Sequence, residues 1–209
     1  MPRKSARASL RQGVADVFRR AILEAAEHVF STCGFAEAKM ADIADRAGLA
    51  AGTLYKHFES KEEIFRALLD HCGDEFVRAL DSEPVTPAAS VRDQLIPLVR
   101  AVLNHVEQRS AVFKLCLELG ATDEWSIRRV GGVEAERRYK GYLARFTEVL
   151  AEGARKSEVR KDLSPEELAL MLTGSLNAFI HGWFTRGRKS DLASRAPALI
   201  DVFLHGVGT

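Results

Sequence analysis

The sequence is poor in the residues that define several common protein classes. It has three cysteines among 209 residues, and Cys33, Cys72 and Cys116 lie far apart with no C-x-x-C pair. This odd count argues against a disulfide framework and a zinc finger, is typical of a reducing compartment, and leaves open whether a cysteine senses oxidants. The six histidines show no H-E-x-x-H or similar spacing. No metal site and no cofactor are therefore predicted.

A large net charge and an uninterrupted apolar segment are also missing. The formal net charge is only +1, so a nucleic-acid site has to be a local patch. No apolar run follows the basic N-terminus, and no signal peptide is predicted. Residues 168–185 carry no charge, but Ser, Thr, Asn, His and Gly interrupt them. We interpret them as a buried helix and expect a cytoplasmic protein without a membrane partner.

Positive charge is concentrated at the start of the chain. Within residues 1–20 only Asp16 is acidic, against Arg3, Lys4, Arg7, Arg11, Arg19 and Arg20. A solvated tail is one interpretation of this segment. The other is a basic arm over residues 1–16 that follows phosphates or enters a minor groove. The motif described below favours the arm.

Hydrophobic periodicity predicts an all-α protein of about nine helices and no convincing strand. The expected helices cover roughly residues 17–32, 40–47, 51–57, a segment from 60, 91–108, 110–119, 125–130, a long segment to 156, 164–187 and 191–205. The clearest linker, residues 81–90, contains two prolines. We expect a small N-terminal bundle over residues 17–62 and a larger helical bundle over residues 63–209.

The most specific pattern lies between residues 34 and 65, GFAEAKMADIADRAGLAAGTLYKHFESKEEIF. Two short helices joined at Gly48 have the geometry of a helix-turn-helix, whose second helix presents its N-terminal residues to base edges. The small residues Ala51, Gly52 and Thr53 lead that helix and allow deep entry into the major groove. The residues that supply hydrogen bonds and charge to phosphates are then Tyr55, Lys56, His57 and Lys61.

This pattern resembles the N-terminal signature of the tetracycline-repressor (TetR) family. The resemblance is carried by Gly34-Phe35, Asp42-Ile43-Ala44, Ala47-Gly48-Leu49, Gly52-Thr53-Leu54-Tyr55, His57-Phe58 and Lys61-Glu62. It implies a three-helix DNA-binding domain followed by a ligand-binding and dimerisation domain. The implied protein is a homodimeric repressor that a small molecule releases from double-stranded DNA at a pseudo-palindromic operator. The resemblance places Tyr55, His57 and Lys61 at phosphates, and Ala51, Gly52, Thr53 and Lys56 at the groove.

The chain departs from the family pattern at the start of both short helices. The family commonly has Thr or Ser where this chain has Ala38 and Lys39, and Ser where it has Ala50. Each missing N-cap hydroxyl costs about 1 kcal/mol. Lys39 is expected to reach a phosphate instead.

The resemblance also implies an effector pocket in the C-terminal part, although each candidate is equally an ordinary core residue. The candidates are Leu95, Val99, Leu103, Phe113, Leu117, Trp125, Tyr142, Phe146 and Asn177, which favour an apolar or aromatic effector. The last two long helices carry apolar stripes wider than one bundle needs. The predicted homodimer interface consists of Leu172, Leu176, Phe179, Trp183, Leu199 and Phe203.

Three alternatives stay open at this point. A protein partner instead of a metabolite would also control such a DNA-bound protein. A helical enzyme is disfavoured, because the sequence shows no nucleophile–base set and no Gly-rich phosphate loop. Activation and repression cannot be separated from sequence, which also names neither the effector nor the operator.

Overall fold

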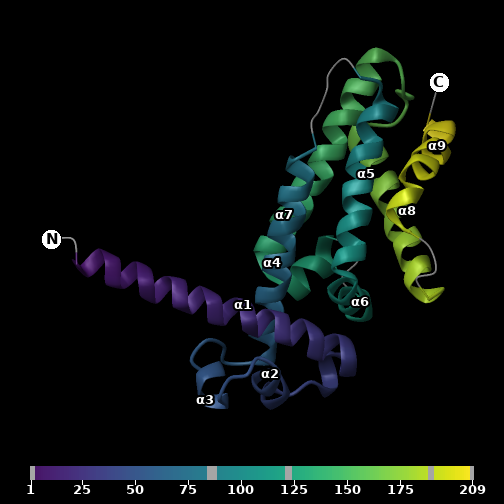
Figure 1. Ribbon diagram of the computed structural model, residues 1–209. Helices are drawn as coiled ribbons and strands as arrows, with labels where there is room; N and C mark the ends of the chain where they lie inside the picture. The colour runs from purple at the N-terminus through teal and green to yellow at the C-terminus, as the bar shows by residue number, and fades with distance from the viewer. Residues whose placement is uncertain (1–2, 84–88, 121–123, 188–190, 208–209) are drawn as a thin grey trace. The chain divides into compact units, whose positions relative to one another are not determined.

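The computed structural model describes residues 3–83, 89–120, 124–187 and 191–207, and within these ranges every regular element is a helix (Figure 1). The chain divides into two compact units, Met1–His71 and Cys72–Thr209. The boundary falls inside the fourth helix, whereas the sequence interpretation placed it at that helix's start. None of the described helices combines the length and the apolar character needed to cross a membrane.

The N-terminal unit contains three helices and the beginning of a fourth. They are α1 (Arg3–Glu37), α2 (Met40–Arg46), α3 (Ala51–Leu54) and the first part of α4 (Lys61–Asp81). α1 begins at Arg3 and not near residue 17, so the segment predicted as an arm is helical from that point. The side chains that hold the unit together are at most 1% exposed: Ile22, Ala26, Phe30, Ile43, Ala44, Leu54, Phe58 and Ile64.

Gly48 makes the turn between α2 and α3. It has a positive φ of 67°, a conformation that side chains with a Cβ avoid. The amide of Gly48 donates to the carbonyl of Asp45 at 3.1 Å, and that of Leu49 to Ala44 at 2.9 Å. This pair of bonds is a Schellman motif, which satisfies the last carbonyls of α2 and reverses the chain. The turn predicted from the sequence is therefore confirmed.

The C-terminal unit is a helical bundle. After the end of α4 it contains α5 (Val91–Gln108), α6 (Ser110–Glu118), α7 (Glu124–Lys156), α8 (Pro165–Thr185), the short 3-10 helix η1 (Ala193–Arg195) and α9 (Ala196–Val207). α7 packs against α8, and α5 packs against α7 and α9. α7 is divided at Gly132, whose backbone is not helical (φ of 80°), so the two helical segments predicted across residues 125–156 are confirmed.

A pair of backbone hydrogen bonds and an ion pair fix η1 and α9 on α5. The carboxylate of Glu107 accepts the backbone N–H groups of Leu192 at 2.7 Å and Ala193 at 3.3 Å. Near the other end, the guanidinium of Arg92 donates to the carboxylate of Asp201 at 2.6 and 3.1 Å. α5 thus binds the segment from η1 through α9 at two separate places.

Side-chain caps start the longer helices as the sequence predicts. The Ser164 hydroxyl accepts the Glu167 N–H at 3.2 Å, and the Glu167 carboxylate accepts the Ser164 N–H at 2.7 Å. This is a complete capping box. The box expected at α4 differs by one residue: Glu63 accepts the N–H of Glu59, not of Ser60.

Candidate nucleic-acid interface

The recognition segment, residues 51–58, has one buried and one exposed side. Leu54 and Phe58 are 0% and 1% exposed and hold the segment in the core of the N-terminal unit. Ala51, Gly52 and Lys56 are exposed, and Tyr55 keeps 53% of its surface accessible. An aromatic side chain this exposed in a packed unit is available for a partner surface. The helical part ends at Leu54, three residues before the predicted end, and continues as a turn.

The starts of α2 and α3 lack side-chain caps. Lys39 precedes α2, and its N–H is accepted by the Asp42 carboxylate at 3.3 Å. Ala50 precedes α3 with extended backbone angles and no side-chain bond. The absence of cap hydroxyls is therefore confirmed, and the Asp42 carboxylate supplies only the reciprocal half of a capping box, the bond from the Lys39 N–H. The Lys39 side chain is exposed beside these amides.

The ammonium group of Lys61 lies at the end of α1. Its Nζ donates to the carbonyl oxygens of Phe35 at 2.8 Å, Ala36 at 2.7 Å and Ala38 at 3.2 Å. It also lies 5.0 Å from the centre of the Phe35 ring. Helix C-termini leave carbonyls without intrahelical partners and favour a cation. Lys61 therefore ties α4 to the end of α1, and its predicted contact with phosphate stays a prediction.

Two residues of α1 that the sequence interpretation did not assign to the site lie against the recognition segment. The ring of Phe18 stands 5.7 Å from the ring of His57. The guanidinium of Arg19 lies 4.6 Å from the centre of the Phe58 ring. Arg19 belongs to the N-terminal excess of basic residues, but no periodicity identifies the ring that it contacts. No pattern in the sequence singled out Phe18.

The predicted pocket residues lie mainly in the core of the C-terminal unit. Leu95, Val99, Leu103 and Phe146 are 0% exposed, and Tyr142 is 7% exposed. Phe113 packs against the same core, and Leu117 and Asn177 are half-buried. The Trp125 side chain lies outside the described residues. These residues are therefore buried or half-buried, apart from Trp125, and their assignment to an effector pocket stays a prediction.

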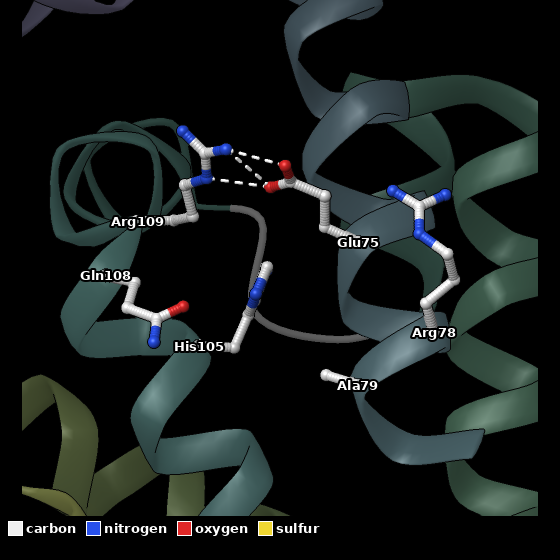
Figure 2. Close-up of a pocket in the computed structure, with 6 residues that line it drawn as sticks. All are labelled: Glu75, Arg78, Ala79, His105, Gln108 and Arg109. Atoms are coloured by element: carbon white, nitrogen blue, oxygen red, sulfur yellow. Dashed lines mark hydrogen bonds and ion pairs between the residues drawn. The ribbon is translucent and has the colours of Figure 1, made fainter. Parts of the chain in front are cut away.

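A polar pocket of about 540 Å³ lies between α4 and α5 in the C-terminal unit, and none of the predicted pocket residues lines it. Its lining residues are Glu75, Arg78 and Ala79 of α4, His105 and Gln108 of α5, and Arg109 at the junction with α6. In the view of Figure 2 the Glu75 and Arg109 side chains point toward each other, and Arg78 lies on the other side of Glu75. No sequence pattern indicated this pocket, because its two walls are separated in the chain by a linker and most of α5.

An ion pair and a buried imidazole dominate the chemistry of this α4–α5 pocket. The Arg109 guanidinium donates to Glu75 through Nε at 2.8 Å and Nη2 at 2.7 Å (Figure 2). His105 is 5% exposed, and its ring contacts those of Phe76 and Phe113. Burial lowers the pKa of His105, an effect that Glu75 opposes and Arg109 reinforces. The imidazole is therefore neutral at physiological pH.

The predicted dimer residues fall into two groups. Leu172 and Leu176 are 1% exposed and Trp183 is 8% exposed, so these three pack mainly inside the protomer. Phe179, Leu199 and Phe203 are half-buried on the outer side of α8 and α9. There a groove of about 430 Å³ is lined by Phe179, Trp183, Arg186, Arg195, Ala198, Leu199 and Val202. Val202, which is 76% exposed, was missing from the prediction.

A helix-turn-helix with an exposed recognition segment, joined to a separate helical unit, defines a DNA-binding transcription regulator. Residues 22–68 match the model of the family described as "bacterial regulatory proteins, tetR family". The C-terminal region of YsiA-like proteins matches residues 73–206. The chain belongs to the tetR family, and it is a regulator and not an enzyme.

Proteins similar to this chain include a regulator of fatty acid metabolism and other transcriptional regulators. The fatty acid metabolism regulator protein of Bacillus subtilis is 22% identical, over 89% of this chain and 93% of that protein. The transcriptional regulator TtgR of Pseudomonas putida is 29% identical, over 89% of each. The crystal structure of FadR from Bacillus subtilis in complex with stearoyl-CoA has a TM-score of 0.72 at 20% identity, covering 90% of this chain and 98% of that one.

Proposed function

We propose that this regulator is a cytoplasmic homodimer that represses its genes from a pseudo-palindromic operator until an effector releases it. The observation that carries the proposal is the division of the recognition segment. Leu54 and Phe58 anchor it in the core, while Ala51, Gly52 and Tyr55 stay exposed. Only small side chains lead the exposed side, so the segment can approach base edges closely.

The proposed roles follow from position and chemistry. Thr53 reads a base through its hydroxyl and methyl groups, with Ala51 and Gly52 giving it room. Tyr55, Lys56, His57 and Lys39 contact phosphates and set the register on the duplex. Lys61 acts through the end of α1, to which its ammonium is bonded.

The outer face of α8 and α9 supports the homodimer. Val202, which is 76% exposed, lines a mostly apolar groove together with Arg186 and Arg195. Met171 of α8 is also 51% exposed. A second copy of the same face would cover these side chains in a four-helix arrangement. Such a dimer would bind two half-sites one DNA turn, or a multiple of it, apart, which is the basis for a pseudo-palindromic operator.

We infer that the effector is a long-chain acyl compound. Two observations support this class: the similarity to the fatty acid metabolism regulator protein of Bacillus subtilis, and the likeness to a regulator that binds stearoyl-CoA. The apolar or aromatic effector predicted from the sequence is compatible with the acyl chain.

Selection of bound sequences from a random DNA pool tests the proposal. An inverted repeat should be enriched, and its affinity should fall steeply with salt. Thr53→Ala should weaken the selected site about tenfold or more while random DNA changes little, because one base contact contributes about 1–3 kcal/mol of discrimination. Thr32→Ala, an exposed threonine of α1, is the matched control.

Equal losses on selected and random DNA for Thr53→Ala would remove its assigned role. No enrichment at all would contradict the repressor proposal and leave control by a protein partner as the better account. Release of the selected site by stearoyl-CoA, measured separately, tests the effector class.

A further inference from the structure

The α4–α5 pocket contains more positive than negative charge. Its ionised residues are Arg78, Arg109 and Glu75, and the neutral His105 adds no charge. The Arg78 side chain is exposed, and no hydrogen bond or ion pair joins its guanidinium to another described residue. Gln108 adds an exposed amide, and the methyl side chain of Ala79 takes up little of the floor. The lining therefore offers several N–H donors with one carboxylate among them.

These donors come from separate elements that converge on one space. Arg78 extends from α4, Gln108 from the last turn of α5, and Arg109 from the α5–α6 junction (Figure 2). Guanidinium groups bind carboxylates and phosphates through parallel N–H···O bonds. The pocket volume of about 540 Å³ is in the range of small-molecule sites, roughly 300–1,000 Å³.

We propose that the α4–α5 pocket binds an oxyanionic head group, carboxylate or phosphate, between Arg78 and Arg109. The proposal rests on the proposed function in that the head group is taken to belong to the effector. Gln108 donates a further hydrogen bond from its amide. The acyl chain itself has no place in this polar space, so only the charged end of the ligand is assigned to it.

Glu75 couples ligand binding in the pocket to the contact between α4 and the α5–α6 junction. Its carboxylate occupies the Nε and Nη2 edge of Arg109, the edge that a ligand oxyanion would also use. An incoming oxyanion therefore competes with Glu75 for N–H donors. Because the Glu75–Arg109 pair joins α4 to the α5–α6 junction, ligand binding weakens the connection between these elements. The equilibrium shifts only if the ligand binds the two arrangements with different affinity.

The test uses the full chain and three probes: coenzyme A without an acyl chain, stearate, and stearoyl-CoA. Each is titrated calorimetrically at one fixed ionic strength. Arg78→Gln should weaken the binding of an anionic probe about tenfold, the effect of one charge-assisted hydrogen bond. Glu75→Gln should strengthen it several-fold, since the competing carboxylate is removed. Arg100→Gln, an exposed arginine of α5 outside the pocket, is the matched control and should change affinity less than twofold.

The pattern of the three probes identifies the source of the oxyanion. Binding of coenzyme A that depends on Arg78 assigns a phosphate, and binding of stearate that depends on Arg78 assigns a carboxylate. Opposite effects of Arg78→Gln and Glu75→Gln are not expected from a purely structural role, in which both substitutions would only destabilise the unit.

Unchanged affinity in Arg78→Gln, or no binding of any probe, would overturn the proposal for this pocket. The proposed function fails on different evidence, namely the absence of a selected operator. Titration of that operator with each variant, without any probe, keeps the two questions separate: Arg78→Gln should bind DNA as the unchanged protein does.

Discussion

Replacing Lys61 with methionine removes a cation that donates to three carbonyl oxygens at the end of α1. Methionine keeps most of the apolar side-chain length over Phe35. Hydrogen bonds to a charged group contribute about 1.5–3 kcal/mol when buried, but Lys61 is half-exposed and water replaces part of the loss. We expect the free energy of unfolding of the N-terminal unit to fall by about 2 kcal/mol in total.

The effect of Lys61→Met on DNA binding distinguishes a phosphate contact from a structural role of Lys61. A lysine that contacts a phosphate releases a counterion, so its loss lowers the salt slope of log affinity by about 0.9. A lysine whose N–H groups are taken by carbonyls changes the slope little, and affinity falls by a similar factor at every salt concentration. We expect the second result for Lys61→Met, on selected and random DNA alike.

Lys56→Met is the comparison, because Lys56 is exposed and has no bonded partner among the described residues. It should lower the salt slope by about 0.9 with a stability change under about 0.5 kcal/mol. Urea unfolding and filter binding at several salt concentrations measure both quantities. A reduced slope and unchanged stability for Lys61→Met would refute the reasoning and restore the phosphate contact predicted from the sequence.

Three further substitutions test local features. Ala50→Ser should stabilise the N-terminal unit by about 1 kcal/mol in thermal unfolding, because a hydroxyl there can cap α3; no gain would mean that the turn holds the side chain away. Ser157→Gly should add about 0.5–1 kcal/mol, since Ser157 ends α7 at φ of 58°, unless its Oγ contact with Lys161 offsets the relief. His105 has a lowered folded pKa, so the unfolded state binds more protons, and stability should be lost as pH falls below the ordinary value of about 6.5. His105→Gln should flatten urea midpoints between pH 7.5 and 5.5, and an unchanged slope would assign the titration to other groups.

Helices with a strong local pattern could be predicted well from the sequence. The predicted bounds of α5 agree with the observed Val91–Gln108, because its apolar residues repeat at helical spacing and Ser90 caps its start. The Ser164–Glu167 box gave the start of α8 for the same reason. The first part of α1 was missed because residues 3–16 are mostly polar and basic. Such a segment shows no apolar periodicity, so a helix there cannot be distinguished from a flexible tail.

Side-chain partners distant in the chain could not be predicted. The charge of Lys61 and its position at a helix start follow from the sequence, but the carbonyls that it binds belong to residues 35–38. The pairing of Glu75 with Arg109 likewise depends on how α4 and α5 pack. The stripe on α8 showed which residues are apolar but not that Leu172 faces the protomer core while Phe179 lies toward its surface.

The two contacts that join α5 to η1 and α9 make these helices move as one rigid body. Glu107 holds the start of η1, and Arg92 holds Asp201 of α9. Glu107 stands between His105 and Gln108, which line the α4–α5 pocket, so the same helix carries a wall of that pocket and supports the proposed interface. A ligand that shifts α5 would therefore move the contact surface of its own subunit directly, with no loop in between to absorb the displacement. In a homodimer, the partner subunit would sense a ligand that it has not itself bound.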